Sequence, residues 1–277
     1  MAGKKKDTSL LHHLIGSRSL VWNLAKNDIK KKFAGSYFGV VWAFVQPVIT
    51  VLLYWFVFEK GLNSKATDLR TGIEIPFVLW LTAGLVPWFY FQEALNGGTG
   101  VLVEYSYLVK KVVFQIDMLP VVKMISALFT HLFFVAFTIV LFICMGYMPD
   151  WYALQVVYYS FCMILFATGL VYATIAVTVF FRDMKEVVGI LLQIGMWVTP
   201  IMWNFETMVQ IPGWAITVLK LNPMYYIVSG YRNALINHIG FWEDMGLTVY
   251  FWVVTAVILF LGTTVFKRLR PHFADVL

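Results

Sequence analysis

Few residues of this sequence are of the types and spacings that carry out chemistry. It contains no GxxxxGK[ST] phosphate loop, no zinc-binding HExxH, no CxxC pair and no GxSxG nucleophile. The adjacent His12 and His13 make a poor metal site, and Cys144 and Cys162 fall in or at the edge of apolar runs, where a thiol behaves as a small hydrophobe. We therefore expect no catalytic residue, no metal and no cofactor in this chain.

Two ionisable residues lie within apolar runs, where charge is costly. His131 needs only one hydrogen-bonding neighbour to satisfy its neutral ring, so we interpret it as a packed structural residue rather than a proton relay. We expect Glu93 to reach the membrane interface or to pair with a cation such as Lys123. No chain of acids and bases follows these runs, which argues against a proton-coupled transporter.

The composition is that of an integral membrane protein. Hydrophobic residues make up 60% of the 277 residues and charged residues 13%, against a usual charged share of about 25%. No soluble core of this length could hide so much apolar surface. The composition excludes a secreted disulfide scaffold, an ordinary soluble enzyme and a nucleic-acid-binding protein.

Six charge-poor runs approach or exceed the roughly 20 apolar residues that a membrane-spanning helix needs. The alternation typical of a β-barrel is absent. We predict an all-α integral membrane fold in a single domain, 1–277, with spans at about 38–58, 76–100, 119–144, 153–180, 187–204 and 246–266.

The distribution of Lys and Arg predicts the topology. An even number of spans places both termini on one side, and the segments on that side carry 16 of the 21 Lys and Arg residues. Because cytoplasmic segments are enriched in these residues, we expect both termini in the cytoplasm. The net charge of +6 is then a topology signal and does not indicate nucleic-acid binding.

Three segments are apolar but do not span. Residues 8–35 are predicted to form an amphipathic helix on the lipids of the inner leaflet, either as an anchor or as a surface for lipid headgroups or a partner. Residues 101–120 carry an apolar face that either caps the bundle or meets another protein. Residues 204–244 break into pieces too short to cross, which favours re-entrant or interfacial helices.

Several motifs occur in a characteristic order. They are Ser-Tyr-Phe-Gly-Val-Val-Trp at 36–42 followed by Gln46 and Pro47, Gly-Leu-Val-Pro-Trp-Phe at 84–89, Leu-Val-Lys-Lys-Val-Val-Phe at 108–114 followed by Leu119 and Pro120, Phe-Phe-Arg-Asp-Met-Lys-Glu at 180–186, Asn-Pro-Met-Tyr-Tyr-Ile-Val at 222–228 and Gly-Tyr-Arg at 230–232. Together they resemble the membrane subunit of the polysaccharide and polyol-phosphate exporters, a branch of the ABC-2 type transporters. The resemblance covers about residues 20–277.

The chain departs from the family pattern at two positions. Phe38 replaces a usual Leu, and Gln115 stands where Pro is common. Residues 225–232 and the tail at 270–275 look most like the permeases that export wall teichoic acid, whereas nearby branches export O-antigen or capsular glycans.

The resemblance implies a homodimeric permease of the bacterial cytoplasmic membrane, bound to two copies of a separate ATPase that holds ATP and Mg²⁺. It would move an undecaprenyl-diphosphate-linked glycan outward. Residues 103–117 would form a coupling helix on the ATPase, and residues 205–236 a re-entrant outer gate.

The resemblance also assigns residues to these parts. Those implied in coupling are Glu104, Tyr105, Leu108, Lys110, Lys111, Phe114, Arg182 and Asp183. Those implied at the substrate entrance are Lys30, Lys31, Lys32, Ser36, Phe38, Gly39 and Trp42. Those implied at the outer gate are Asn222, Pro223, Tyr225, Tyr226 and Arg232.

Other functions stay open. An ABC-2 permease for drugs or lipids would share these motifs, because no motif encodes the substrate. A channel or secondary transporter would move its substrate without a bound ATPase. A membrane transferase would need an acid or histidine constellation at the interface, and the sequence shows none.

Overall fold

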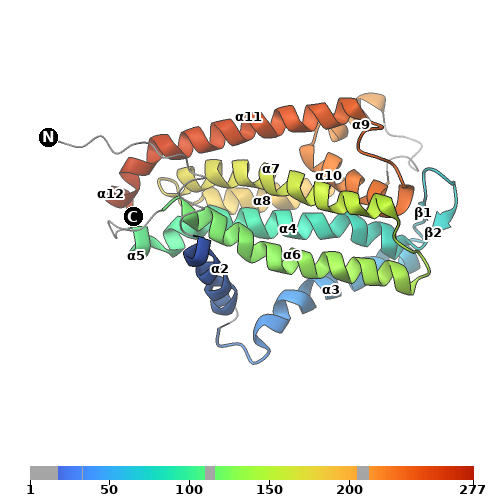
Figure 1. Cartoon of the computed structure of the whole chain (residues 1–277), viewed down its shortest axis with the longest axis horizontal. Helices are drawn as coiled ribbons and strands as arrows, with labels where there is room; N and C mark the ends of the chain where they lie inside the picture. The colour runs from blue at the N-terminus through green and yellow to red at the C-terminus, as the bar shows by residue number, and fades with distance from the viewer. Residues whose placement is uncertain (1–17, 33, 110–115, 205–211) are drawn as a thin grey trace.

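The computed structural model describes residues 18–32, 34–109, 116–204 and 212–277. The chain is mostly helical, and its long helices run side by side (Figure 1). At one end lie α2 (Arg18–Lys32), α5 (Ser106–Val109) and the C-terminal α12 (Phe273–Val276), and we call this the α2 end. At the opposite, hairpin end, β1 (Ala66–Thr67) pairs antiparallel with β2 (Glu74–Ile75).

Helices lie within all six segments predicted to span the membrane. They are α3 (Trp42–Trp55), α4 (Phe77–Glu104), α6 (Met118–Cys144), α7 (Gln155–Thr178), α8 (Met184–Val198) and α11 (Met245–Leu269). Within the described residues, four stretches are long and apolar enough to cross a membrane: Trp42–Gly61, Met118–Cys144, Trp151–Thr178 and Met245–His272. These four agree with the predicted multi-pass fold, and the full number of six stays a prediction.

The helix α4 is central, which explains why it is less apolar than the four candidate spans. Of its 28 residues, 20 are buried, and it packs against α6, α7, α8 and the short α10 (Pro223–Arg232). A helix surrounded by protein does not need a lipid-compatible surface, so it can carry polar residues such as Glu93.

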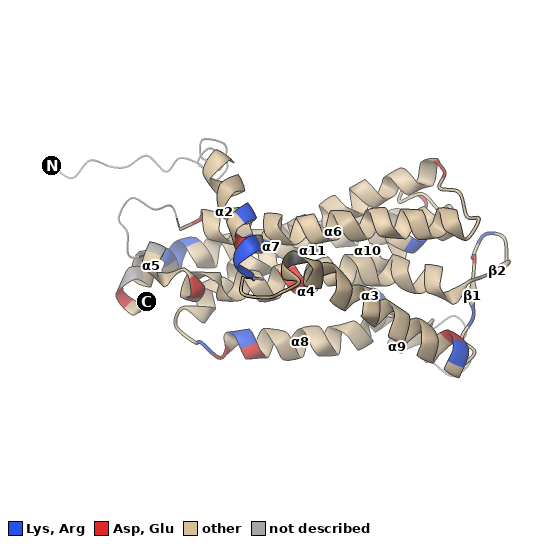
Figure 2. Cartoon of the chain, turned by 90° about the horizontal axis from the view of Figure 1, so that it is seen from below, with Lys and Arg blue, Asp and Glu red and all other residues tan. Residues whose placement is uncertain are grey.

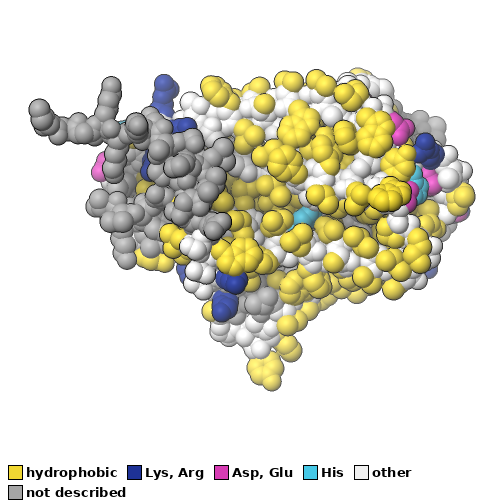
Figure 3. Space-filling view, in the orientation of Figure 1, with side chains coloured by type: hydrophobic (Ala, Val, Ile, Leu, Met, Phe, Trp, Pro, Cys, Tyr) yellow, Lys and Arg dark blue, Asp and Glu magenta, His cyan; other side chains and the backbone are white. Residues whose placement is uncertain are grey.

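The outer surface of the bundle is apolar between its two ends. Hydrophobic side chains are spread over the middle and right of the face in Figure 3, and charged residues in Figure 2 gather at the ends and around α2. The helices α3, α8 and α11 each expose large apolar side chains, including Leu53, Ile190 and Phe260. Exposed apolar area of this extent is typical of a lipid-facing or subunit-facing surface.

Glycines bring α7 and α11 into backbone contact. A Cβ atom at Gly262 of α11 would overlap the carbonyl oxygen of Gly169 on α7, and a Cβ at Gly169 would lie 2.8 Å from the backbone nitrogen of Leu259. Small residues at such crossings allow membrane helices to pack closely.

The segment between α8 and α11 contains two short helices. The helices α9 (Gly213–Lys220) and α10 have 8 and 10 residues, too few to cross a bilayer. Asn222 begins α10 by accepting a hydrogen bond from the Met224 amide at 3.0 Å, and its side-chain amide donates to Thr199 after α8 at 2.7 Å. Residues 205–211 of the predicted gate lie outside the described residues, and the re-entrant path stays a prediction.

Candidate functional site

The amphipathic helix α2 is docked on the bundle. Val21 and Ala25 are buried one turn apart, and they pack against Met118 and Val122 of α6. Asp28 continues the same face, because positions i, i+4 and i+7 of a helix align. A carboxylate therefore stands on the buried stripe of α2.

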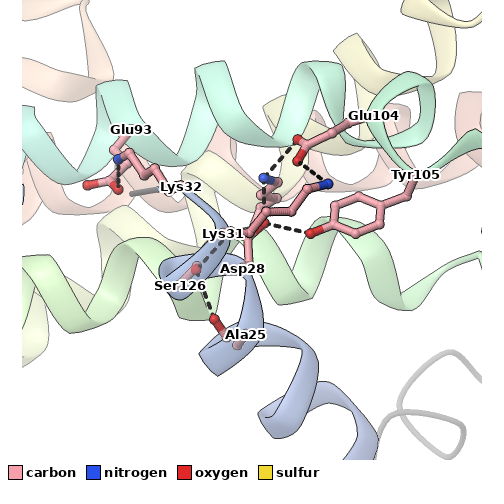
Figure 4. Close-up of polar contacts among 9 residues, drawn as sticks. Ala25, Asp28, Lys31, Lys32, Glu93, Glu104, Tyr105 and Ser126 are labelled. Atoms are coloured by element: carbon pink, nitrogen blue, oxygen red, sulfur yellow. Dashed lines mark hydrogen bonds and ion pairs between the residues drawn. The ribbon is translucent and has the colours of Figure 1, made fainter. Parts of the chain in front are cut away.

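Asp28 accepts hydrogen bonds from two other elements (Figure 4). One carboxylate oxygen accepts from the Tyr105 hydroxyl at 2.9 Å and from the Lys123 ammonium at 2.6 Å. The other accepts from the Ser126 hydroxyl at 2.9 Å. These charge-assisted bonds compensate for burying a carboxylate that has only 7% of its side chain exposed.

The contacts continue outward through Glu104. Lys123 also contacts Glu104 at 2.9 Å, and Lys31 lies 3.5 Å from the same carboxylate. The Lys31 ammonium also lies 4.7 Å from the centre of the Tyr105 ring. We call Asp28, Lys31, Glu104, Tyr105, Lys123 and Ser126 the Asp28 network.

The Tyr105 hydroxyl donates to a carboxylate that disfavours its ionisation. Burial, and then the hydrogen bond to the Asp28 carboxylate, raise the pKa of Tyr105 above its ordinary value of 10.0. A tyrosine is already protonated near neutral pH, and these contacts move its ionisation further from that range. Removing one partner of the buried Asp28–Lys123 pair would cost about 3–5 kcal/mol by the behaviour of such pairs.

Glu93 has a different partner from the one the sequence suggested. It pairs with Lys32 of α2 at 2.7 Å, whereas Lys123 is held by Asp28 and Glu104. The sequence suggested a cation such as Lys123 for this role, and docking of α2 brings Lys32 to Glu93 instead. Because half of the Lys32 side chain is exposed, this pair contributes at most about 1 kcal/mol.

A cleft of about 830 Å³ opens beside the network, between α2, α3, α4, α6 and the start of α8. Its lining combines aromatic rings, amides and charges of both signs. The lining residues are Asp28, Ile29, Lys31, Lys32, Ala43, Phe44, Gln46, Pro47, Phe89, Gln92, Glu93, Asn96, Gly97, Glu104, Lys123, Ser126, Phe129, Thr130 and Lys185. Such a cleft can take an amphiphilic ligand, with ammonium groups for an anion and rings for an apolar or sugar part.

The structure divides the predicted entrance residues into two groups. Lys31 and Lys32 line the cleft, whereas Lys30 and Ser36 are exposed outside the lining set. Phe38 and Trp42 also lie outside it, where Phe38 stacks edge-to-face on Trp42 at 5.8 Å. Gly39 joins them with a φ of +53°, a left-handed conformation that suits glycine, and helps turn the chain between α2 and α3.

The predicted coupling residues are likewise separated. Glu104 ends α4 and Tyr105 caps it, and both contact α2 or α6 through the Asp28 network. Leu108 lies in the four-residue α5, while Lys110, Lys111 and Phe114 lie outside the described residues. Arg182 and Asp183 are exposed in the turn before α8. The coupling role of this set stays a prediction.

The predicted outer residues belong to a packed region. Arg232 is buried and donates to the Pro200 and Ile201 carbonyl oxygens, each at 2.7 Å, while its guanidinium lies 3.3 Å from the centre of the Trp80 ring. The Tyr226 hydroxyl lies 3.1 Å from the Thr248 hydroxyl of α11.

Two of these outer residues, Asn222 and Pro223, begin α10. Tyr225 is buried, and together with Arg232 it lines a cavity of about 280 Å³ at the hairpin end. The whole set therefore either holds α10 in place or faces this cavity.

His131 is packed as its structural interpretation expects. It is 2% exposed, and its Nε2 lies 3.2 Å from the Ser160 hydroxyl and 3.0 Å from the Tyr231 hydroxyl. Both neighbours are uncharged, so these contacts suit a neutral ring.

Sequence reasoning missed Asp28 and Ser126 as members of a site. The signal for Asp28 was its position: an acid seven residues after Val21 and three after Ala25 interrupts the apolar stripe of α2. Ser126 gives no signal of its own, because a serine in an apolar helix commonly bonds to its own backbone.

Comparisons with known proteins give a consistent picture. Residues 19–236 match the family described as ABC-2 type transporter. The chain is 25% identical over 266 residues to the O-antigen export system permease protein RfbA of Myxococcus xanthus, covering 96% of this chain and 98% of that one. It is 21% identical over 258 residues to the protein of the same name from Klebsiella pneumoniae, covering 92% and 93%.

Proposed function

Because this chain belongs to the ABC-2 type transporter family, we propose that it is the membrane permease subunit of an ATP-driven polysaccharide exporter. Its substrate is a glycan linked to a lipid diphosphate, which moves outward across the bacterial cytoplasmic membrane. Two similar proteins that match nearly the whole chain are named as O-antigen export permeases, which supports polysaccharide as the cargo.

The observation that carries this proposal is the cleft at the α2 end. Lys31, Lys32 and Lys185 line it together with the rings of Phe44 and Phe89. A lipid-linked glycan presents a diphosphate between an apolar tail and a sugar, so it needs cations and apolar surface together. The three acids in the same lining limit the attraction for the anion, which suits a substrate that must leave again.

The proposal places the α2 end in the cytoplasm. The last turn of α2 carries Lys30, Lys31 and Lys32, and the last turn of α11 carries Lys267 and Arg268. This excess of basic residues at the α2 end is typical of cytoplasmic segments. Two copies of the chain form the permease, and two copies of a separate ATPase bind ATP and Mg²⁺. This chain does not itself hydrolyse ATP.

Two glycan classes remain candidates, each with its own support. Residues 225–232 and the tail at 270–275 resemble permeases for wall teichoic acid. The relatives named for O-antigen export favour a lipid-linked O-antigen polysaccharide.

The test is ATP hydrolysis by the chain purified with its native ATPase in lipid nanodiscs. An undecaprenyl-diphosphate-linked glycan should stimulate hydrolysis, with the preferred class identified by comparing teichoic-acid and O-antigen precursors. Undecaprenyl phosphate and a drug-like amphiphile are the controls. Stimulation by the amphiphile alone, or transport by the permease without any ATPase, would contradict the proposal.

A further inference from the structure

We infer that Asp28 is a positioning residue for transport, which ties the movement of α2 to the coupling segment 103–117 through the Tyr105 hydroxyl. This inference rests on the proposed function. It concerns a link between two cytoplasmic parts of the permease, and it is carried by the contacts of the Asp28 network.

Tyr105 stands at the junction between α4 and the coupling segment. The 28-residue α4 ends at Glu104, the Tyr105 amide still donates to the Val101 carbonyl at 2.9 Å, and α5 begins at Ser106. The Tyr105 side chain is 6% exposed, so it points into the bundle and not toward a partner. Its hydroxyl is thus an internal contact of the segment predicted to touch the ATPase.

Asp28 joins this junction to α2. Its other two donors, Lys123 and Ser126, both belong to α6. Because a buried carboxylate without its donors is strongly destabilised, α2 cannot move away unless these contacts break or their partners move with it. Of the three donors, Tyr105 alone belongs to the coupling segment and bonds Asp28 directly. Lys123 reaches that segment only indirectly, through its contact with Glu104.

The network also borders the cleft. Asp28, Lys31, Glu104, Lys123 and Ser126 all line it. An anionic headgroup in the cleft would compete with Glu104 for Lys31 and change the charge balance around Asp28. Occupancy of the cleft, the position of α2 and the conformation at Tyr105 therefore form one linked equilibrium, and such linkage acts in both directions.

Two substitutions separate this role from simple docking of α2. Tyr105→Phe and Ser126→Ala each remove one hydroxyl donor to the same carboxylate, and both leave the Lys123 contact in place. A purely structural network predicts similar effects. Positioning through Tyr105 predicts that only the first variant uncouples the two parts, because Ser126 belongs to α6 and not to the coupling segment.

The experiment uses the full complex with the native ATPase and measures the ratio of glycan-stimulated to unstimulated ATP hydrolysis. Tyr105→Phe should lower this ratio about five-fold or more beyond any change that Ser126→Ala causes, since five-fold is the lower range of coupling between sites. Assembly and melting temperature of both complexes are measured alongside. Equal ratios in the two variants would overturn the inference.

A second readout does not need a glycan. In a Cys144→Ser background, the substitution Lys26→Cys at an exposed position of α2 reports the position of this helix by its rate of thiol labelling. Trapping the ATPase with ATP and vanadate should change this rate in the otherwise unsubstituted chain and after Ser126→Ala, but not after Tyr105→Phe. If no glycan stimulates hydrolysis, the proposed function fails, and this labelling result alone decides the inference. A trapping effect that persists after Tyr105→Phe contradicts it.

Discussion

Arg232 shows how one side chain can fix the ends of several helices. Its guanidinium donates to two carbonyls beyond the end of α8 and rests on the Trp80 ring of α4, while its own backbone belongs to α10. The planar fork of arginine can hold both carbonyls and stack on the ring at once, and the compact ammonium of lysine cannot.

We therefore predict that Arg232→Lys destabilises the protein although the charge is conserved. The loss should be roughly 1.5–3 kcal/mol, the range for hydrogen bonds that involve charged groups, and it should appear as a lower melting temperature in detergent. The matched control is Arg268→Lys, the same change at an exposed position near the end of α11. Equal melting temperatures for the two variants would show that the geometry at Arg232 does not contribute to stability.

At the scale of elements, the helices meet through contacts that depend on residue size. The crossing of α7 and α11 leaves no room for a side chain at Gly262, because Gly169 places its carbonyl oxygen there. Glycine in a helix is intrinsically unfavourable, so its presence at this crossing is explained by packing.

The replacement Gly262→Ala should separate α7 from α11 and destabilise the bundle by roughly 1–3 kcal/mol, the usual cost of overpacking. Thermal unfolding in detergent measures the effect. As a control, Gly189→Ala places the same methyl group on α8, where a Cβ meets nothing within 4 Å. There, the higher helix propensity of alanine should leave stability unchanged or slightly raised. A Gly262→Ala protein as stable as the control would contradict the close crossing.

At the scale of the whole molecule, charge is separated from the apolar middle and concentrated near the two ends (Figure 2). Basic residues near the α2 end can serve two purposes, which are to orient the protein in the membrane and to contact partners. Lys110 and Lys111 lie in the coupling segment predicted from sequence, whereas Lys267 and Arg268 close the last turn of α11.

We predict that the double substitution Lys110→Glu and Lys111→Glu abolishes co-purification with the ATPase or export of the glycan. The reason is that reversed charge repels the surface that the lysines would meet. Lys267→Glu with Arg268→Glu removes the same positive charge from the proposed cytoplasmic side and controls for topology. If the first variant retained both assembly and export, the coupling role of residues 103–117 would be wrong.

The sequence determined much of this protein by itself. Apolar runs of sufficient length predict helices, and helices lie in all six of the predicted segments. The order of its motifs indicated the ABC-2 type transporter family, and the match over residues 19–236 confirmed this. These features are readable because hydrophobic length and local motifs are properties of contiguous residues.

Only the tertiary structure decided which residues form the site. Docking of α2 brings Asp28 within hydrogen-bonding distance of Tyr105, which lies 77 positions away, and brings Lys32 to Glu93. Packing of α6, α7, α8 and α10 around α4 explains the polar residues of that helix. The tertiary structure also buries the Tyr105 side chain. Such pairings depend on how the helices cross. Side-chain packing between segments distant in sequence sets the crossing, and a hydrophobic pattern along the sequence does not encode that packing.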